Sequence, residues 1–88
     1  MFETINERVN VLAGFKQRKN RVEVRPYLMD WRGERYPLTV FGLYHPARRG
    51  EKFLHVFEYA SGNAKFRLEM DSETLEWTLT EVYHDYST

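Results

Sequence analysis

Two neighbouring β-strands joined by a tight turn are predicted by the stretch Phe53-Leu-His-Val-Phe-Glu-Tyr-Ala-Ser-Gly-Asn-Ala-Lys-Phe-Arg-Leu-Glu-Met70. In its second half, Phe66, Leu68 and Met70 alternate with charged residues, so one face of the strand is apolar and the other polar. The Ser-Gly-Asn sequence at 61–63 supplies the turn that reverses the chain. A strand that is buried on one face and hydrated on the other is typical of an antiparallel sheet.

The rest of the chain predicts four further strands, which gives a sheet of six. We expect strands over about residues 7–16, 21–31, 34–44 and 75–83, in addition to 53–59 and 64–70. Pro26 has no N–H to donate and marks an edge or a bulge. Gly33 supplies the positive φ of a hairpin turn, and Gly42 marks a bend where the sheet curls over itself. Residues 45–50 are expected to form a connecting loop.

The N-terminal residues allow two interpretations. Thr4-Ile-Asn-Glu7 has the form of a helix capping box, which favours a short helical turn. Against this, Val9, Val11, Ala13 and Phe15 alternate as in a strand, and β-branched residues and glycine weaken a helix. We therefore expect a strand entered through a short turn, and the helical turn stays open as an alternative.

The predicted fold is all-β: an antiparallel six-stranded meander, built either as a strongly twisted sheet or as a small, partly open barrel. Six strands in so short a chain would expose both sheet edges unless the sheet curls toward closure. With 88 residues the chain forms a single domain, residues 1–88. The two ends, residues 1–6 and 84–88, are expected to fray.

Composition sets limits on the class of protein. The chain has six Phe, six Tyr and two Trp, enough aromatic surface for a small core, and no cysteine for disulfides or thiolate metal sites. Residues 1–52 hold 11 Lys and Arg against 6 Asp and Glu, and residues 53–88 hold 2 against 7, so the net charge is zero. No apolar run reaches the roughly 18 residues of a membrane span. The acidic N-terminus and the lack of disulfide staples favour a cytoplasmic location over secretion.

Catalysis and cofactor binding are not expected. His45, His55 and His84 lie on different predicted elements without the short spacing of a local metal site, and His55 is interpreted as a half-buried strand residue. Ser61 and Ser72 fall in predicted turns, outside the strand-turn-helix setting of a catalytic serine. No set of residues offers a nucleophile, an orienting base and an oxyanion donor together. The chain is therefore predicted to be a non-enzyme without metal or cofactor.

One predicted hairpin offers a candidate binding surface. Trp31-Arg-Gly-Glu-Arg-Tyr36 presents aromatic and guanidinium groups at a turn, and further arginines lie on other segments. Such groups stack single-stranded bases in small β-domains. Alternatively, Trp31 and Tyr36 close the end of the core as a cross-strand pair while the arginines solvate the turn. We call these candidates the arginine–aromatic set; its members are Arg25, Trp31, Arg32, Arg35, Tyr36, Arg48 and Arg49.

The same hairpin resembles a group of short, uncharacterised prokaryotic all-β proteins with a Trp-x-Gly-x-x-Tyr hairpin. Later elements of that group are matched by Phe66-Arg-Leu68, Trp77-Thr-Leu79 and Glu81-Val-Tyr83, so the likeness covers roughly residues 5–83. Glu34 stands where the group usually has arginine, and Met29 where an aromatic residue is common. Some members are similar to a domain of unknown function found near lesion-bypass polymerases. The resemblance implies a β-sheet fold and assigns no catalytic residue.

These observations predict a small domain that binds a protein partner or a second copy of itself through an exposed strand edge. The alternative is a nucleic-acid-binding module that uses the arginine–aromatic set. A small-molecule barrel is disfavoured, because six strands with this many aromatic residues fill their own interior. No membrane association is expected.

Overall fold

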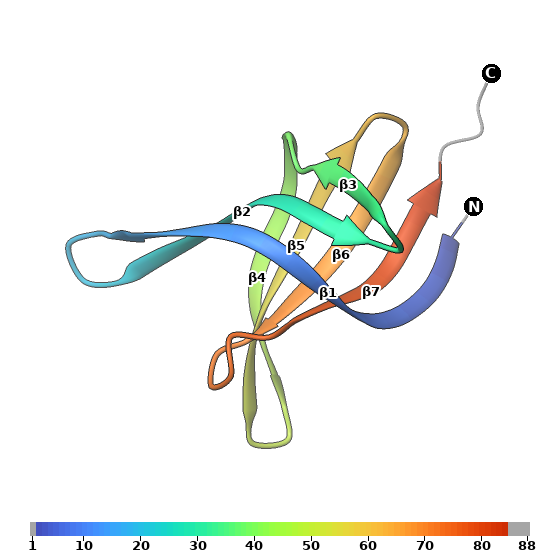
Figure 1. Cartoon of the computed structure of the whole chain (residues 1–88). Coiled ribbons are helices and arrows are strands. Elements are labelled where there is room, and N and C mark those ends of the chain that lie inside the picture. The colour runs from blue at the N-terminus through green and yellow to red at the C-terminus, as the bar shows by residue number, and fades with distance from the viewer. Residues whose placement is uncertain (1, 85–88) are drawn as a thin grey trace.

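A computed structural model describes residues 2–84 as one antiparallel sheet of seven strands (Figure 1). In chain order the strands are β1 (Phe2–Gln17), β2 (Val22–Trp31), β3 (Glu34–Pro37), β4 (Val40–Arg49), β5 (Lys52–Ser61), β6 (Ala64–Asp71) and β7 (Trp77–His84). Their order in the sheet is β3-β2-β1-β7-β6-β5-β4, so the first strand lies beside the last. The predicted all-β antiparallel class is confirmed, and the sheet stays open with β3 and β4 as its two edges.

The prediction of six strands is wrong, because the segment 34–44 contains two strands rather than one. Tyr36, Leu38 and Val40 alternate like one strand, yet the chain leaves the sheet at Leu38 and Thr39. The Leu38 N–H donates the last hydrogen bond to β2, at 2.8 Å from the Tyr27 carbonyl oxygen, and its side chain is buried. Beyond Thr39 the chain continues as β4 on the opposite edge of the sheet.

Two further expectations are corrected. Residues 45–50 are not a loop: β4 continues to Arg49 and turns through only Gly50 and Glu51 into β5. Pro46 is compatible with this strand because an edge strand needs donors on one side only. The N-terminal helical turn is also wrong, since β1 begins at Phe2 and no helix occurs in residues 2–84. Of the ends expected to fray, residues 2–6 lie in β1 and residue 84 in β7, while residues 1 and 85–88 lie outside the described residues.

Tight turns connect most of the strands, and the sequence predicts those at Gly33 and at residues 61–63. Two-residue hairpin turns lie between paired residues at 31 and 34, 49 and 52, and 61 and 64. Each holds a glycine with positive φ, a conformation without steric cost only for glycine; Gly33 is at +79°. Between β6 and β7, the Asp71 carboxylate accepts a hydrogen bond from the Glu73 N–H at 2.8 Å and forms an Asx turn. This hydrogen bond lowers the pKa of Asp71.

The core lies on the concave face of this one curled sheet, and β1 and β2 cross in front of β4–β6 (Figure 1). Register shifts in four of the strand pairings mark bulges, which increase the local twist. The curl brings β3 over β6, where the Tyr36 ring lies 5.2 Å from the Phe66 ring. The buried core residues are Val9, Met29, Leu38, Phe57, Tyr59, Phe66, Leu68, Met70, Trp77, Leu79 and Val82.

The split of the third predicted strand gives a direct test of the fold. Leu38→Ala should lower the free energy of unfolding by about 2–5 kcal/mol, because Leu38 is only 3% exposed inside the core. Val40→Ala should change it by less than about 0.5 kcal/mol, because Val40 is 60% exposed on β4. Urea unfolding measures both. A continuous strand would bury both residues on one face, so equal losses would contradict the fold.

Candidate functional site

The arginine–aromatic set does not form one surface. Residues 31–36 lie at the β2–β3 turn, whereas Arg48 and Arg49 lie at the β4–β5 hairpin, at a different end of the molecule (Figure 1). Arg25 lies along β2, over the ring of Tyr27 at 5.1 Å. The set is therefore three separate groups, which could not line a single track for a nucleic-acid strand.

Trp31 and Arg32 are held by an acidic residue of β1. The indole N–H of Trp31 donates to Glu7 Oε1 at 2.9 Å, and the Arg32 guanidinium donates to both oxygens of the same carboxylate. Arg32 also lies over the Trp31 ring, 4.7 Å from its centroid. The hydrogen bond from Arg32, followed by that from Trp31, lowers the pKa of Glu7. The half-buried indole thus joins the β2–β3 turn to β1 and closes one end of the core.

The remaining arginines of the set also have partners. Arg35 Nε contacts Asp30 Oδ1 at 3.1 Å, and Arg48 lies 5.2 Å from the centre of the Phe53 ring. Arg49 forms a bidentate pair with Glu69, with N–O distances of 3.1 and 2.9 Å. Ion pairs of this kind lower the free positive charge that a phosphate backbone would meet.

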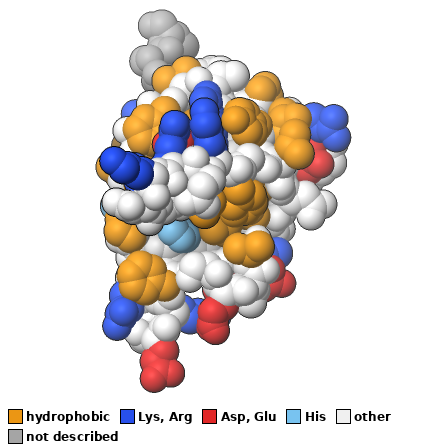
Figure 2. All heavy atoms as spheres, turned by 90° about the vertical axis from the view of Figure 1, so that its left-hand side faces the viewer, with side chains coloured by type: hydrophobic (Ala, Val, Ile, Leu, Met, Phe, Trp, Pro, Cys, Tyr) orange, Lys and Arg blue, Asp and Glu red, His pale blue; other side chains and the backbone are white. Residues whose placement is uncertain are grey.

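A different site is formed where the curled sheet leaves a groove between β2 and the β4–β5 hairpin. The cavity there has a volume of about 500 Å³. Phe57 and Tyr59 of β5 are buried at its floor, while Phe41 and Tyr44 of β4 are partly exposed. Figure 2 shows this side of the molecule, with hydrophobic side chains inside a hollow and basic side chains gathered above it. We call it the β2–β4 groove; its lining residues are Arg18, Arg21, Val22, Glu23, Val24, Arg25, Thr39, Phe41, Tyr44, His55, Phe57 and Tyr59.

A bulge in β4 turns two aromatic side chains toward this groove. The register with β5 shifts between Phe41 and Leu43, so Gly42 is an extra residue and Phe41 and Tyr44 share one face. A Cβ at Gly42 would lie 3.2 Å from the Glu58 carbonyl oxygen, which explains why the smallest residue stands there. This is the position at which the sequence predicts a bend.

His55 and Tyr44 form the polar end of the groove. The Tyr44 hydroxyl lies 2.8 Å from His55 Nδ1, and the two rings stack with centroids 5.9 Å apart. His55 is half-buried on a strand, as predicted. Burial also raises the pKa of the Tyr59 phenol, so that side chain stays neutral at the floor of the groove.

The charge of the groove is positive. Glu23 pairs with Arg18 at 2.7 Å, and this hydrogen bond lowers the pKa of Glu23. Arg21 and Arg25 form no ion pair with any described residue. The three arginines and one glutamate among the lining residues leave two positive charges in excess.

Backbone groups complete the site, because both strands that flank the groove have an unpaired edge there. β3 pairs only with residues 28–31 of β2, which leaves the outer edge of residues 22–26 without a partner strand. β4 is an edge strand over its whole length. Such edges present backbone N–H and C=O groups that can pair with an added strand.

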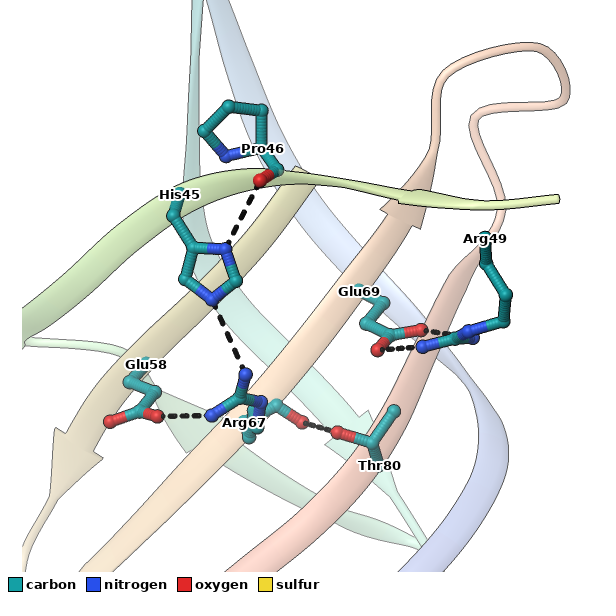
Figure 3. A network of polar contacts seen from close by, with 7 residues as sticks. All are labelled: His45, Pro46, Arg49, Glu58, Arg67, Glu69 and Thr80. Carbon is teal, nitrogen blue, oxygen red and sulfur yellow. Dashed lines mark hydrogen bonds and ion pairs between the residues drawn. The ribbon is translucent and has the colours of Figure 1, made fainter. Parts of the chain in front are cut away.

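The opposite face of β4 is fixed by a polar network with β5, β6 and β7 (Figure 3). Arg67 Nη1 donates to Glu58 at 2.8 Å, and its Nη2 lies 3.3 Å from His45 Nε2. His45 Nδ1 lies 3.2 Å from the Pro46 carbonyl oxygen, which can only accept, so Nε2 is the ring's acceptor toward Arg67. Together with the pair between Arg49 and Glu69, this network holds the edge strand in place.

Among residues 2–84, no three His, Asp or Glu side chains converge as a metal ion would require. Nor does that part of the chain contain a membrane-spanning helix. Comparison with family models, with curated proteins and with solved structures finds no match to this chain.

Of the groove residues, only Arg25 belongs to the arginine–aromatic set that the sequence predicts. The aromatic wall was missed because Phe41, Tyr44, Phe57 and Tyr59 come from two strands and meet only through the bulge at Gly42. One signal did point there: both faces of the predicted strand become apolar near Phe41, more than a half-buried strand needs.

The contact between Glu7 and Arg32 predicts a pH dependence. Because the pKa of Glu7 is lowered in the folded chain, its pairing stabilises the fold fully above its ordinary pKa of 4.5. That stabilisation is lost as the pH falls through the lower folded pKa. Glu7→Gln should therefore destabilise the protein most near neutral pH, and the difference from the unaltered protein should shrink in acid.

The Trp31 indole N–H resonance gives a local readout, since it should titrate with Glu7 and stay flat in Glu7→Gln. Glu23→Gln serves as a control, because Glu23 is also an exposed, arginine-paired carboxylate but does not contact Trp31. An indole titration that persists in Glu7→Gln would contradict the assignment.

Proposed function

We propose that the protein is a non-enzymatic interaction module whose β4 edge pairs with a strand of another polypeptide. The observation that carries this proposal is an edge strand with exposed apolar side chains. Val40 is 60% exposed, Phe41 58%, Leu43 40% and Tyr44 38%. An exposed apolar edge strand is a template for strand addition, which natural proteins ordinarily blunt with charge.

The pairing segment is the first half of β4. Residues 40–45 contain no Lys, Arg, Asp or Glu, whereas Arg48 and Arg49 lie at the far end of the strand. Pro46 has no N–H and interrupts the row of donors, so a docked strand would pair before it. Beyond Pro46 the basic residues resist close approach of a strand without acidic groups.

The alternative function, nucleic-acid binding, receives less support from the geometry. Arg32, Arg35 and Arg49 are paired with carboxylates, and the Trp31 indole is occupied by Glu7. Titration with labelled single-stranded DNA at low salt checks it, because electrostatic attraction is greatest there. Salt-sensitive binding that is lost on removal of these arginines would favour the alternative.

Strand addition at β4 predicts a specific sensitivity to charge. Peptides selected from a random library for binding should slow amide hydrogen exchange across residues 40–45. Leu43→Lys should weaken their binding by about tenfold or more, about 1.4 kcal/mol, because an edge lysine opposes strand pairing. Isothermal titration measures the affinity, and light scattering shows whether a second copy of the chain occupies the same edge.

Leu75→Lys is the matched control, because Leu75 is 52% exposed but lies in the β6–β7 connection rather than on a strand. It should keep the affinity within about twofold. Selected peptides that protect other amides, or equal losses in the two variants, would count against the proposal.

A further inference from the structure

We infer that the β2–β4 groove receives an extended acidic segment of another polypeptide, with a large apolar side chain seated on its aromatic wall. This inference rests on the proposed function and adds the chemistry of the partner. Three independent features of the groove point to it: an incomplete strand position, an aromatic pocket and uncompensated positive charge.

The place beside β2 that a neighbouring strand would occupy is only half filled, and the empty half lies in the groove. β3 occupies the position beside β2 only along residues 28–31, and the hydrogen bond from Leu38 to Tyr27 is the last on that side. Beyond it, residues 22–26 of β2 continue with a free edge, and the start of β4 faces the same groove. A segment of about five residues, roughly 17 Å long, would continue the line of β3 through this position.

The floor of the position is suited to one large apolar side chain. Phe57 and Tyr59 lie buried beneath it, and Phe41 packs edge-on against Tyr59 with centroids 5.6 Å apart. Tyr44 contacts Phe57 at 5.1 Å from the other side. A cavity of about 500 Å³ falls within the range of pockets that enclose a ligand group.

The positive charge of the groove favours acidic residues at the two ends of the bound segment. Arg21 and Arg25 have no carboxylate partner, and the only acidic residue lining the groove, Glu23, is taken by Arg18. Arginine forms its strongest hydrogen bonds with carboxylates, in bidentate geometry. An occupant with acidic residues flanking its apolar anchor would satisfy both guanidinium groups.

A second copy of the chain fits the groove less well. Of the two edge strands that it could insert, β4 contains two arginines and no carboxylate, and β3 contains one glutamate beside one arginine. Neither strand would bring a net negative charge to Arg21 and Arg25. The groove therefore favours a different, acidic polypeptide, and self-association is an outcome that the test must separate.

The test uses two short capped peptides, acetyl-Glu-Val-Phe-Val-Glu-amide and acetyl-Lys-Val-Phe-Val-Lys-amide, with the full chain. The acidic peptide should bind about tenfold or more tightly than the basic one, with shifts at the amides of residues 22–25 and 40–45. Added salt should weaken its binding. Nuclear magnetic resonance titration gives both the affinity and the location.

Charge-reversal variants distinguish binding in the groove from non-specific electrostatic attraction to the protein. Arg21→Glu combined with Arg25→Glu should abolish the preference for the acidic peptide. Lys16→Glu combined with Lys19→Glu makes the same change in net charge on the same hairpin, at exposed residues outside the groove lining. This control should retain the preference.

Each outcome decides between the two proposals. Equal binding of both peptides at residues 40–45, unaffected by Arg21 and Arg25, would overturn the acidic partner and leave strand addition at β4 intact. The same holds if neither peptide binds while library-selected neutral peptides protect β4. A dimer that the acidic peptide does not displace would also overturn the inference, because the groove would then belong to a second copy.

Discussion

The two residues Leu38 and Thr39 impose the constraint on which this structure depends. They connect β3 to β4, which are the opposite edges of a seven-stranded sheet. Three Cα–Cα steps from Pro37 to Val40 span at most about 11 Å. A flat sheet of seven strands would place its edges several times farther apart, at about 4.8 Å for each neighbouring pair. The sheet must therefore curl until its edges meet at this one point.

The curl also allows a single-layered sheet to bury its apolar face. One sheet without a covering helix or second sheet has no partner for its apolar face, so it must bury that face against itself. Leu38 contributes directly, since its side chain enters the core at the point where the edges meet. On the convex face, Leu54 and Val56 are buried as well, and the network of Arg67, His45 and Glu58 lies on that side of the strands. Both faces of β5 are thereby protected from water.

The sequence predicts the parts of this fold that are local. The alternation in residues 64–70 specifies a strand, and Gly33 after Trp31-Arg32 specifies a hairpin turn. Neither prediction needs knowledge of distant residues. The end of β3 before Leu38 was not predictable from alternation. Leu38 lies in the connection between the two sheet edges, yet its side chain is buried where a continuous strand would also bury it. The extension of β4 through Pro46 was missed for a related reason: proline excludes a central strand, and edge position is a tertiary property.

The same distinction applies to the candidate site. The Trp31 hairpin was visible because its aromatic and basic residues are adjacent in the sequence, yet in the fold Glu7 of β1 occupies them. The groove was invisible because its parts are separated: the arginines come from the β1–β2 hairpin, the aromatic residues from β4 and β5, and only the curl brings them together. Local sequence pattern is thus a poor guide to this proposed binding surface, whose residues are brought together by which strands become edges.

The short length of β3 explains why the curled sheet stays open. Pro37 ends the strand with a residue that cannot donate a hydrogen bond, and the chain then has to reach the far edge within two residues. A longer β3 would pair with residues 22–26 of β2 and fill the groove from within. Since it does not, the backbone groups of two strands and an aromatic surface remain available at one place. Because β3 ends before it covers residues 22–26, the fold leaves the site at which we propose that a strand from another polypeptide is added.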